Sequence, residues 1–160
     1  MKHTISIIAA LLLVITACGG EENKKKKFQY NRVQKKEQKE TTSSSKTPID
    51  LNNKGIGPIT DFTFPESIDT DMAAAGETAF KQKCTACHYP NKRLIGPAMK
   101  GVYSRRHPAW VLNMLLNPTE MLEKDPIAKA LLKEYNNVIM LNQNLSETEA
   151  RAIAEYLRTF

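Results

Sequence analysis

The sequence predicts an all-α domain in its C-terminal part, over residues 61–160. Apolar residues recur there at helical spacing in several segments, and residues suited to helix N-termini precede these segments. No alternation of apolar and polar residues is long enough to indicate a strand. About a hundred residues can bury one small core, so one domain is the natural count.

The first helix is expected over about residues 71–82. Its N-cap can be supplied by Asp69, Thr70 or Asp71. Apolar residues then recur at helical spacing, namely Met72, Ala75, Ala79 and Phe80. This amphipathic segment leads directly into a pair of cysteines.

Three later helices are indicated by their first residues. Pro108 and Pro126 each suit the first turn of a helix. The N–H groups of that turn have no partner inside the helix, so the N–H that proline lacks costs no hydrogen bond there. The segment behind Pro108 ends at Asn117-Pro118, and Asn136-Asn137 ends the next one. The last helix opens with a capping box, Ser-Glu-Thr-Glu at residues 146–149, and carries an apolar stripe of Ala150, Ile153, Ala154 and Leu157.

The most informative motif is Cys-Thr-Ala-Cys-His at residues 84–88. Two thiols three positions apart can add to the two vinyl groups of one porphyrin, while the adjacent imidazole reaches the iron. The motif therefore predicts one haem c, attached through Cys84 and Cys87, with His88 as the proximal ligand of the iron.

The same motif has three alternative interpretations: coincidence, a redox-active C-x-x-C pair, and half of a zinc site. A structural zinc site needs about four Cys or His ligands, and outside the motif the chain has only His3, Cys18 and His107. A thioredoxin-type motif follows a strand in a βαβ pattern, whereas a helical pattern precedes this one. Haem attachment is therefore the favoured interpretation.

The N-terminus predicts export. A short positive start precedes an apolar run over residues 5–17, which is shorter than the about 18 residues that a membrane span needs and fits a secretory signal peptide. The residues before Cys18 resemble a lipobox, so we expect removal of residues 1–17 and diacylation of Cys18. The protein is then a membrane-anchored lipoprotein facing the periplasm or the cell exterior. An ordinary signal peptide with an unrelated cysteine is the alternative.

Residues 18–60 are expected to form the lipidated N-terminus and a flexible basic tether. The segment is polar, with consecutive lysines at residues 24–27, and cannot bury enough apolar surface to offset the entropy of ordering. Residues 19–60 carry a net charge of +5, whereas residues 61–160 carry 12 basic and 12 acidic residues. The basic charge belongs to the tether, where it suits anionic lipid headgroups, and no nucleic-acid partner is expected.

The order of these parts resembles class I c-type cytochromes over residues 72–160. The matching elements include a helix with Gly76 and Phe80, the haem motif, Gly96-Pro97, and a methionine before Leu-Ser-Glu-Thr-Glu. The resemblance implies a cytochrome c fold, with about four to five helices around a single haem attached outside the cytoplasm. It also implies that Gly76 lets the first helix approach the last one closely near Tyr156.

Further residue roles are implied by this resemblance. The Pro97 carbonyl is expected to accept the proton on the outer nitrogen of the His88 ring, which fixes the ring's orientation. Arg105 and Trp110 are expected to hydrogen-bond the haem propionates. The alternatives are a plain core position for Trp110 and a solvated surface position for Arg105 and its neighbour Arg106.

The sixth ligand of the iron is expected to be a methionine sulfur, and Met140 stands where the resemblance places it. It precedes the capped last helix, although leucine follows it where the family often has proline. Met121, in a loop or helix start, is the competitor. Met99 lies in the stretch expected on the proximal side of the haem, and Met114 lies within a helix, where a core position fits better. His107 fits a surface position at a helix start better than it fits a second histidine ligand.

Electron transfer is the expected function, with the tether letting a monomeric domain shuttle between redox protein partners. The stretch over residues 108–134 also resembles small cytochromes associated with nitrous-oxide reductase systems. The alternatives are a haem sensor or peroxidase-like enzyme with an open sixth site, and a fixed subunit of a reductase or oxidase complex. The apolar residues around Met140, without an acid–base pair, favour an electron carrier over an enzyme.

Overall fold

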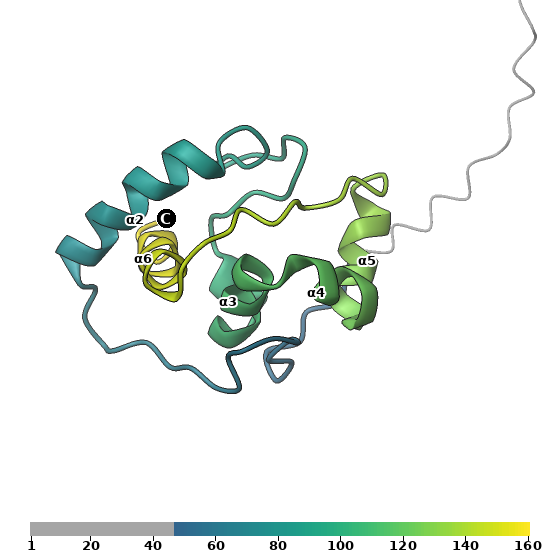
Figure 1. The fold of residues 1–160 in the computed structure, drawn as a ribbon, viewed down its shortest axis with the longest axis horizontal. Coiled ribbons are helices and arrows are strands. Elements are labelled where there is room, and N and C mark those ends of the chain that lie inside the picture. The colour runs from purple at the N-terminus through teal and green to yellow at the C-terminus, as the bar shows by residue number, and fades with distance from the viewer. Residues whose placement is uncertain (1–46) are drawn as a thin grey trace, which may run out of the picture. The chain divides into compact units, whose positions relative to one another are not determined.

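The computed structural model describes residues 47–160, and within this range it contains five α-helices, one 3-10 turn and no strand. The expected all-α class is confirmed. Figure 1 shows α6 beside α2, with α3, α4 and α5 following one another on the other side of α6. The elements are α2 (Thr70–Lys83), η1 (Val102–Ser104), α3 (Pro108–Leu116), α4 (Pro118–Lys124), α5 (Pro126–Glu134) and α6 (Glu147–Leu157).

The helices begin where the sequence supplies caps. The Asp69 carboxylate accepts hydrogen bonds from two backbone N–H groups in the first turn of α2, at 3.1 and 2.9 Å. The Asp125 carboxylate caps α5 in the same way, at 2.7 Å from the Ala128 nitrogen. Ser146 and Glu149 form the reciprocal capping box of α6. These side chains satisfy N–H groups that have no partner inside their own helix.

Helix α4 is the element that the sequence does not predict clearly. Asn117-Pro118 was expected to end one helix, with a loop or helix start behind it. Pro118 instead begins a short helix directly after α3, and this helix ends at Asp125, where α5 begins. Three short helices, each with a proline in its first turn, therefore connect the haem motif to the last helix.

Helices α2 and α6 cross at Gly76. A Cβ atom on Gly76 would lie 1.9 Å from the Ala152 carbonyl oxygen, so only glycine allows this approach. The expected close contact is present, one turn earlier along α6 than the expected position near Tyr156. The Tyr156 ring instead packs against Phe80, with ring centroids 5.6 Å apart.

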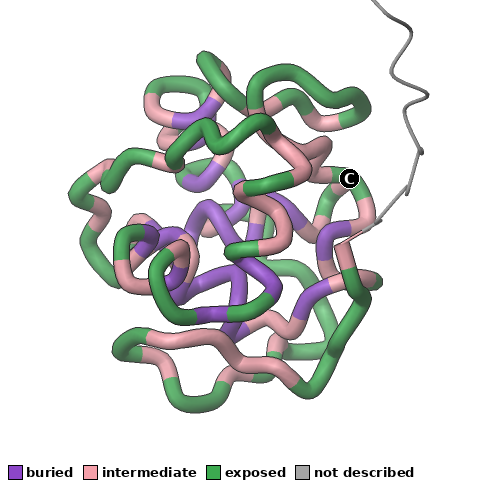
Figure 2. The backbone as a smooth tube through the Cα atoms, turned by 90° about the vertical axis from the view of Figure 1, so that its right-hand side faces the viewer, coloured by how far each residue is buried: buried purple, intermediate pink, exposed green. Residues whose placement is uncertain are grey.

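The hydrophobic core lies between α2, α6 and the three short helices, as the buried segments in Figure 2 show. Burial of these side chains supplies the main favourable free energy of folding. The buried core side chains include Phe80, Val102, Trp110, Leu112, Leu115, Met121, Ile127, Ile153 and Leu157.

Residues 47–60 belong to the domain, which corrects the boundary expected at residue 60. The Asn113 side chain, at the centre of α3, donates to the carbonyl oxygens of Lys54 and Ile59 at 2.9 and 2.8 Å. Asn53 donates to the Asp125 carboxylate at 2.7 Å. Ile56 and Ile59 also pack against the hydrophobic core. Composition could not show these contacts, because the hydrogen bonds join the segment to residues more than fifty positions away. We call residues 47–59 the strap.

The rest of the expected tether, residues 18–46, lies outside the described residues, as do Cys18 and the expected signal peptide over residues 1–17. Residues 47–60 contain one lysine and one aspartate, so the excess of positive charge stays in residues 19–46.

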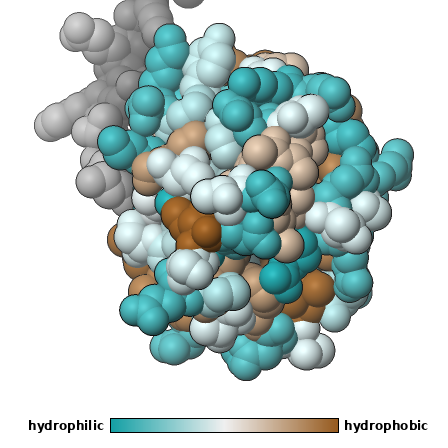
Figure 3. Space-filling view, turned by 90° about the vertical axis from the view of Figure 1, so that its left-hand side faces the viewer, coloured by the Kyte–Doolittle hydropathy of each residue, from teal (hydrophilic) through white to brown (hydrophobic). Residues whose placement is uncertain are grey.

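The face of the domain on which α2 lies is mixed in character. Figure 3 shows hydrophilic residues over much of this face, with hydrophobic residues in separate small groups. None of the helices in residues 47–160 combines the length and the hydropathy of a membrane span.

The α6 capping box makes a testable contribution to acid stability. The Ser146 backbone N–H, the Lys83 ammonium and the Ser146 hydroxyl lower the pKa of Glu149 from 4.5 to about 2. Because the folded pKa is depressed, this contribution is fully present above pH 4.5 and is lost as the pH falls to about 2. We expect Glu149→Gln to lower the thermal midpoint at neutral pH and to flatten its decline with acid, as followed by circular dichroism.

Glu147→Gln is the matched control for this prediction. Glu147 lies in the same first turn of α6 and makes none of these side-chain contacts in the described structure. If Glu147→Gln flattens the decline of the thermal midpoint with acid as much as Glu149→Gln does, the capping box is not the source of that decline.

Candidate haem site

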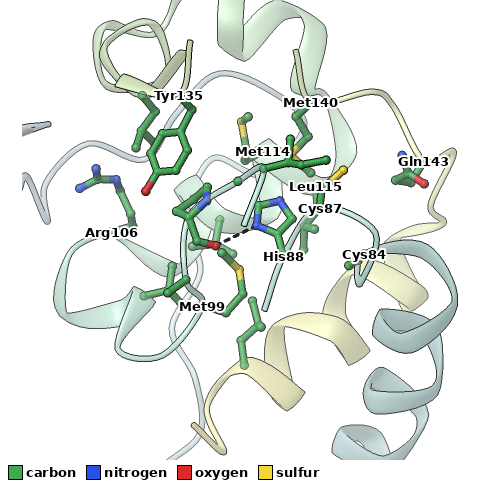
Figure 4. Close-up of a pocket in the computed structure, with 18 of the residues that line it drawn as sticks. Cys84, Cys87, His88, Met99, Arg106, Met114, Leu115, Tyr135, Met140 and Gln143 are labelled. Atoms are coloured by element: carbon green, nitrogen blue, oxygen red, sulfur yellow. Dashed lines mark hydrogen bonds between the residues drawn. The ribbon is translucent and has the colours of Figure 1, made fainter. Parts of the chain in front are cut away.

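The haem motif lies in a tight turn that follows α2. Cys84 caps the C-terminus of α2 through a hydrogen bond from its N–H to the Phe80 carbonyl, at 2.9 Å. The N–H groups of Cys87 and His88 both donate to the Cys84 carbonyl, at 3.0 and 2.9 Å. This turn brings both thiols and the imidazole to the wall of one cavity (Figure 4). Burial raises the pKa of the free Cys84 thiol to about 11, so before any covalent attachment it is a neutral thiol at physiological pH.

The imidazole of His88 is held by the loop that follows it. Its Nδ1–H donates to the Pro97 carbonyl oxygen at 3.0 Å, which is the bond that the resemblance implied for Pro97. A Cβ atom on Gly96 would lie 2.4 Å from the ring carbon Cε1, so the backbone packs directly against the ring. Burial lowers the pKa of His88, with the Pro97 bond acting in the opposite direction. A neutral ring with a fixed Nδ1–H leaves Nε2 as the atom able to bind a metal.

The cavity has a volume of about 370 Å³, which lies in the range of roughly 300–1,000 Å³ that is usual for small-molecule and cofactor sites. Its walls are largely apolar, as a porphyrin face requires. The residues present therefore fit a haem: two thiols and an imidazole on one turn, apolar walls, and thioethers within the same cavity. The apolar lining includes Ile95, Val102, Val111, Leu115, Leu122, Leu131, Ile153 and Leu157.

Three methionines line the cavity: Met99, Met114 and Met140. In the view of Figure 4, Met114 and Met140 lie on one side of the His88 ring and Met99 on the other. Met114, which the sequence suggested for the helix core, thus also reaches the cavity. Met140 comes from the loop between α5 and α6.

The competing ligands Met121 and His107 do not line the cavity. Met121 is fully buried in the core, where its sulfur accepts a hydrogen bond from the Ile56 N–H of the strap at 3.0 Å. The His107 ring caps α3, since its Nδ1 accepts the Ala109 N–H at 3.1 Å. Both side chains therefore have structural roles in the described domain.

Arg105 and Trp110 line the cavity, and each donates hydrogen bonds within the protein. The Trp110 indole N–H donates to the buried Asp125 carboxylate at 3.0 Å. The Arg105 guanidinium donates to the carbonyls of Lys100 and Ala98, at 2.9 and 3.1 Å. The alternative of a core position for Trp110 describes the structure better than the propionate role does.

Arg106 was named only under the alternative of a solvated surface position. That alternative does not hold for Arg106, which is 5% exposed and lines the cavity. Its guanidinium lies over the Trp110 ring, 5.4 Å from the centroid. The spacing of four residues between Arg106 and Trp110 is the one local signal that could have indicated this contact.

Comparisons with known proteins agree with this geometry. The family model described as cytochrome c matches residues 73–160. A solved structure, cytochrome c from Rhodothermus marinus, is 44% identical over 64% of this chain and 88% of that chain, with a TM-score of 0.62. An engineered form of that protein, Rma TDE, is 43% identical over 64% of this chain and 89% of its own, also with a TM-score of 0.62. No match was found among curated proteins.

An all-α fold around an apolar cavity, with a C-x-x-C-H turn in its wall, defines a monohaem c-type haem protein. This chain belongs to the cytochrome c family, whose model covers more than half of it. It carries covalently bound haem c, for which Cys84 and Cys87 are the cysteine pair. The family consists of haem electron carriers that are typically exported or periplasmic.

Proposed function

We propose that this protein is a mobile single-electron carrier whose haem iron has His88 and Met140 as axial ligands. The observation that carries this proposal is the place of Met140, which lines the same cavity as His88 while its competitor Met121 is bonded in the core. Met140 also lies on an irregular segment between helices, where backbone adjustment can bring a sulfur to a metal without breaking a helix.

The chain's own residues each have a part in this function. Haem bound in the cavity supplies a one-electron couple between ferric and ferrous iron. Cys84 and Cys87 hold the group covalently, and the bond from His88 to Pro97 keeps the imidazole oriented. A thioether from Met140 favours the ferrous state, and so raises the reduction potential above that of a bis-histidine site.

The lining of the cavity supports electron transfer over catalysis. Among the described residues that line it there is no aspartate or glutamate. A peroxidase-like site needs polar groups that can move a proton beside the iron. The side chains next to Met140, namely Val138, Ile139 and Leu141, are exposed apolar groups that line the cavity and offer neither an acid nor a base.

We also propose that a lipid on Cys18 anchors the protein to a membrane, and that its donor and acceptor are redox proteins, with a nitrous-oxide reductase system as one candidate. The support is the sequence of the leader and the basic segment at residues 19–46. A flexible chain of that length would let the domain reach partners tens of ångströms away.

The test of the proposed function is the visible spectrum of the haem-loaded full chain in both redox states, with carbon monoxide added to the reduced form. We expect a low-spin c-type spectrum, a sulfur-to-iron charge-transfer band in the ferric form, and no response to carbon monoxide. A high-spin spectrum that shifts with carbon monoxide would mean an open sixth site, and a sensor or enzyme would then replace the carrier.

A further inference from the structure

The two sides of the domain differ in charge, although the charges over residues 61–160 sum to zero. Residues 66–77, around the start of α2, carry four acidic residues and no basic one. Residues 84–119, which begin at the haem motif, carry five basic residues and no acidic one. Figure 1 shows α2 and α5 on opposite sides of the domain. The negative charge around the start of α2 therefore lies far from α5.

Three segments of the chain meet at the C-terminal end of α5. The first is the start of the strap, where the Thr47 N–H and hydroxyl both donate to the Glu134 carboxylate. The second is the basic loop after the haem motif. There Arg93 donates to the Glu134 carbonyl oxygen at 2.9 Å, and its guanidinium lies 4.0 Å from the centroid of the Tyr135 ring. The third begins at Val138, whose N–H donates to the Tyr135 carbonyl oxygen at 3.1 Å.

These segments form a surface that combines exposed apolar side chains with exposed cations. We call it the α5-end surface and define it by Ile49, Leu94, Val138, Lys92, Arg93 and Lys133. Its three apolar members are 65%, 39% and 50% exposed. Within residues 47–160, neither lysine has a carboxylate at ion-pair distance. Apolar side chains beside such cations suit the headgroup region of an anionic membrane.

The expected tether joins the domain at this same surface. Because Thr47 is bonded to Glu134, the chain that precedes it must leave the domain at the end of α5. Residues 19–46 carry the excess of positive charge and follow Cys18, the expected site of the lipid. These 28 residues span on the order of 30 Å as an unstructured chain. A surface held so close to a membrane needs only a weak affinity to bind it.

We propose that the α5-end surface is the side on which the tethered domain rests on an anionic membrane. This inference rests on the lipid anchor of the proposed function. The cations of the surface attract anionic headgroups, and its apolar side chains enter the headgroup region. The acidic residues around the start of α2 are repelled by the same headgroups, so the field of the domain selects the orientation that the tether also favours.

This orientation has a consequence for the haem cavity. Tyr135, at the end of α5, lines one end of the cavity, and Figure 4 shows Cys84 and Cys87 at the other end. Docking through the α5-end surface turns the Tyr135 end toward the lipid. The cysteine end, where Cys87 is exposed, then faces protein partners in the aqueous phase.

The first experiment follows the distance between the haem and the lipid headgroups. The acylated, haem-loaded full chain is inserted into vesicles of phosphatidylglycerol or of phosphatidylcholine that carry a fluorescent headgroup label, which haem quenches by energy transfer. We expect stronger quenching on the anionic vesicles, with the difference lost at about 1 M salt, where charges are screened beyond about 3 Å. Equal quenching on both kinds of vesicle would overturn the proposal.

The second experiment separates the charges of the surface from those of the tether. Lys92→Gln and Lys133→Gln remove two cations of the surface and leave the tether unchanged. The matched control is Lys81→Gln, which removes an exposed cation from α2. We expect each surface substitution to lower the ratio of docked to undocked domain about fivefold on anionic vesicles. Lys81→Gln should leave this ratio unchanged, and an equal loss in all three variants would overturn the proposal.

The third experiment tests the apolar part of the surface with Ile49→Ser and Leu94→Ser. The matched control is Ile68→Ser, because Ile68 is 38% exposed, close to the 39% of Leu94, and lies just before α2. We expect weaker quenching on anionic vesicles in the two surface variants than in the control. The absorption spectrum of the haem shows whether each variant keeps its fold. Quenching as strong as in the control would remove the apolar contact from the proposal and reduce the surface to a patch of charge.

The anchor and the surface fail in different ways. Mass spectrometry of the mature N-terminus tests the anchor. A Cys18 without acyl chains rejects the anchor of the proposed function, and with it the membrane as the partner of this surface. An acylated chain in which surface and control variants quench equally rejects the surface alone. Neither result changes the His88–Met140 carrier, which the carbon monoxide experiment tests.

Discussion

Met140→Ala is expected to turn the haem-loaded protein into one that binds carbon monoxide. The substitution removes the thioether proposed as the sixth ligand, and alanine offers no donor in its place. The sulfur-to-iron band should disappear, the reduced protein should bind carbon monoxide rapidly, and the midpoint potential should fall. Absorption spectroscopy and voltammetry measure all three changes.

Two other methionines serve as controls. Met121→Ala removes a fully buried side chain and should cost about 2–5 kcal/mol of stability, while leaving the sulfur-to-iron band in place. Met114→Ala changes the wall of the same cavity without removing the proposed ligand. If Met114→Ala abolishes the band and Met140→Ala does not, the ligand is Met114.

Met140→His extends the same test. Imidazole can also bind the iron, so the haem stays six-coordinate, but the midpoint potential should fall because thioether favours the ferrous state more than imidazole does. An unchanged potential in this variant would exclude Met140 as a ligand.

Gly76→Ala is expected to destabilise the domain by about 3 kcal/mol, at the upper end of the usual cost of overpacking a core. The new Cβ atom would meet the carbonyl oxygen and carbon of Ala152 at 1.9 and 2.4 Å, and the Ile153 nitrogen at 2.9 Å. All three are backbone atoms, which cannot rotate away, so α2 and α6 must move apart. Thermal unfolding measures the cost, at roughly 4–8 °C per kcal/mol for a domain of this size.

The control for Gly76→Ala is the reverse change next to it, Ala75→Gly. Ala75 is exposed on α2, so this variant should lose only the helix propensity of alanine, about 1 kcal/mol. Propensity alone predicts that Gly76→Ala stabilises the helix by a similar amount. A neutral or stabilising Gly76→Ala would therefore show that the helix contact is looser than the structure has it.

Most of the helices could be predicted from the sequence because their signals are local. The Asp69 cap, the prolines at 108 and 126, and the capping box of α6 all act within one turn of the residues they order. Helix α4 could not be predicted, because Asn117-Pro118 is equally suited to end one helix and to begin another.

The site was predicted in part for the same reason. The turn of residues 84–88 and the bond from His88 to Pro97 lie within a short stretch of chain. The propionate role expected for Trp110 stays a prediction, while its indole N–H donates to Asp125, the N-cap of α5, fifteen residues away. Neither composition nor spacing shows such a pairing.

The sequence by itself determined the haem motif and the all-α class, because both depend on residues that are near neighbours in the chain. It also determined the family, because the linear order of motifs over residues 73–160 can be compared without a structure. Only the tertiary structure decided which methionines reach the cavity, that Arg106 is buried there, and that the strap belongs to the domain. The physical reason is that burial and hydrogen bonding between distant segments exist only after the chain has folded, when donors such as Asn53 and Asn113 meet partners more than fifty residues away.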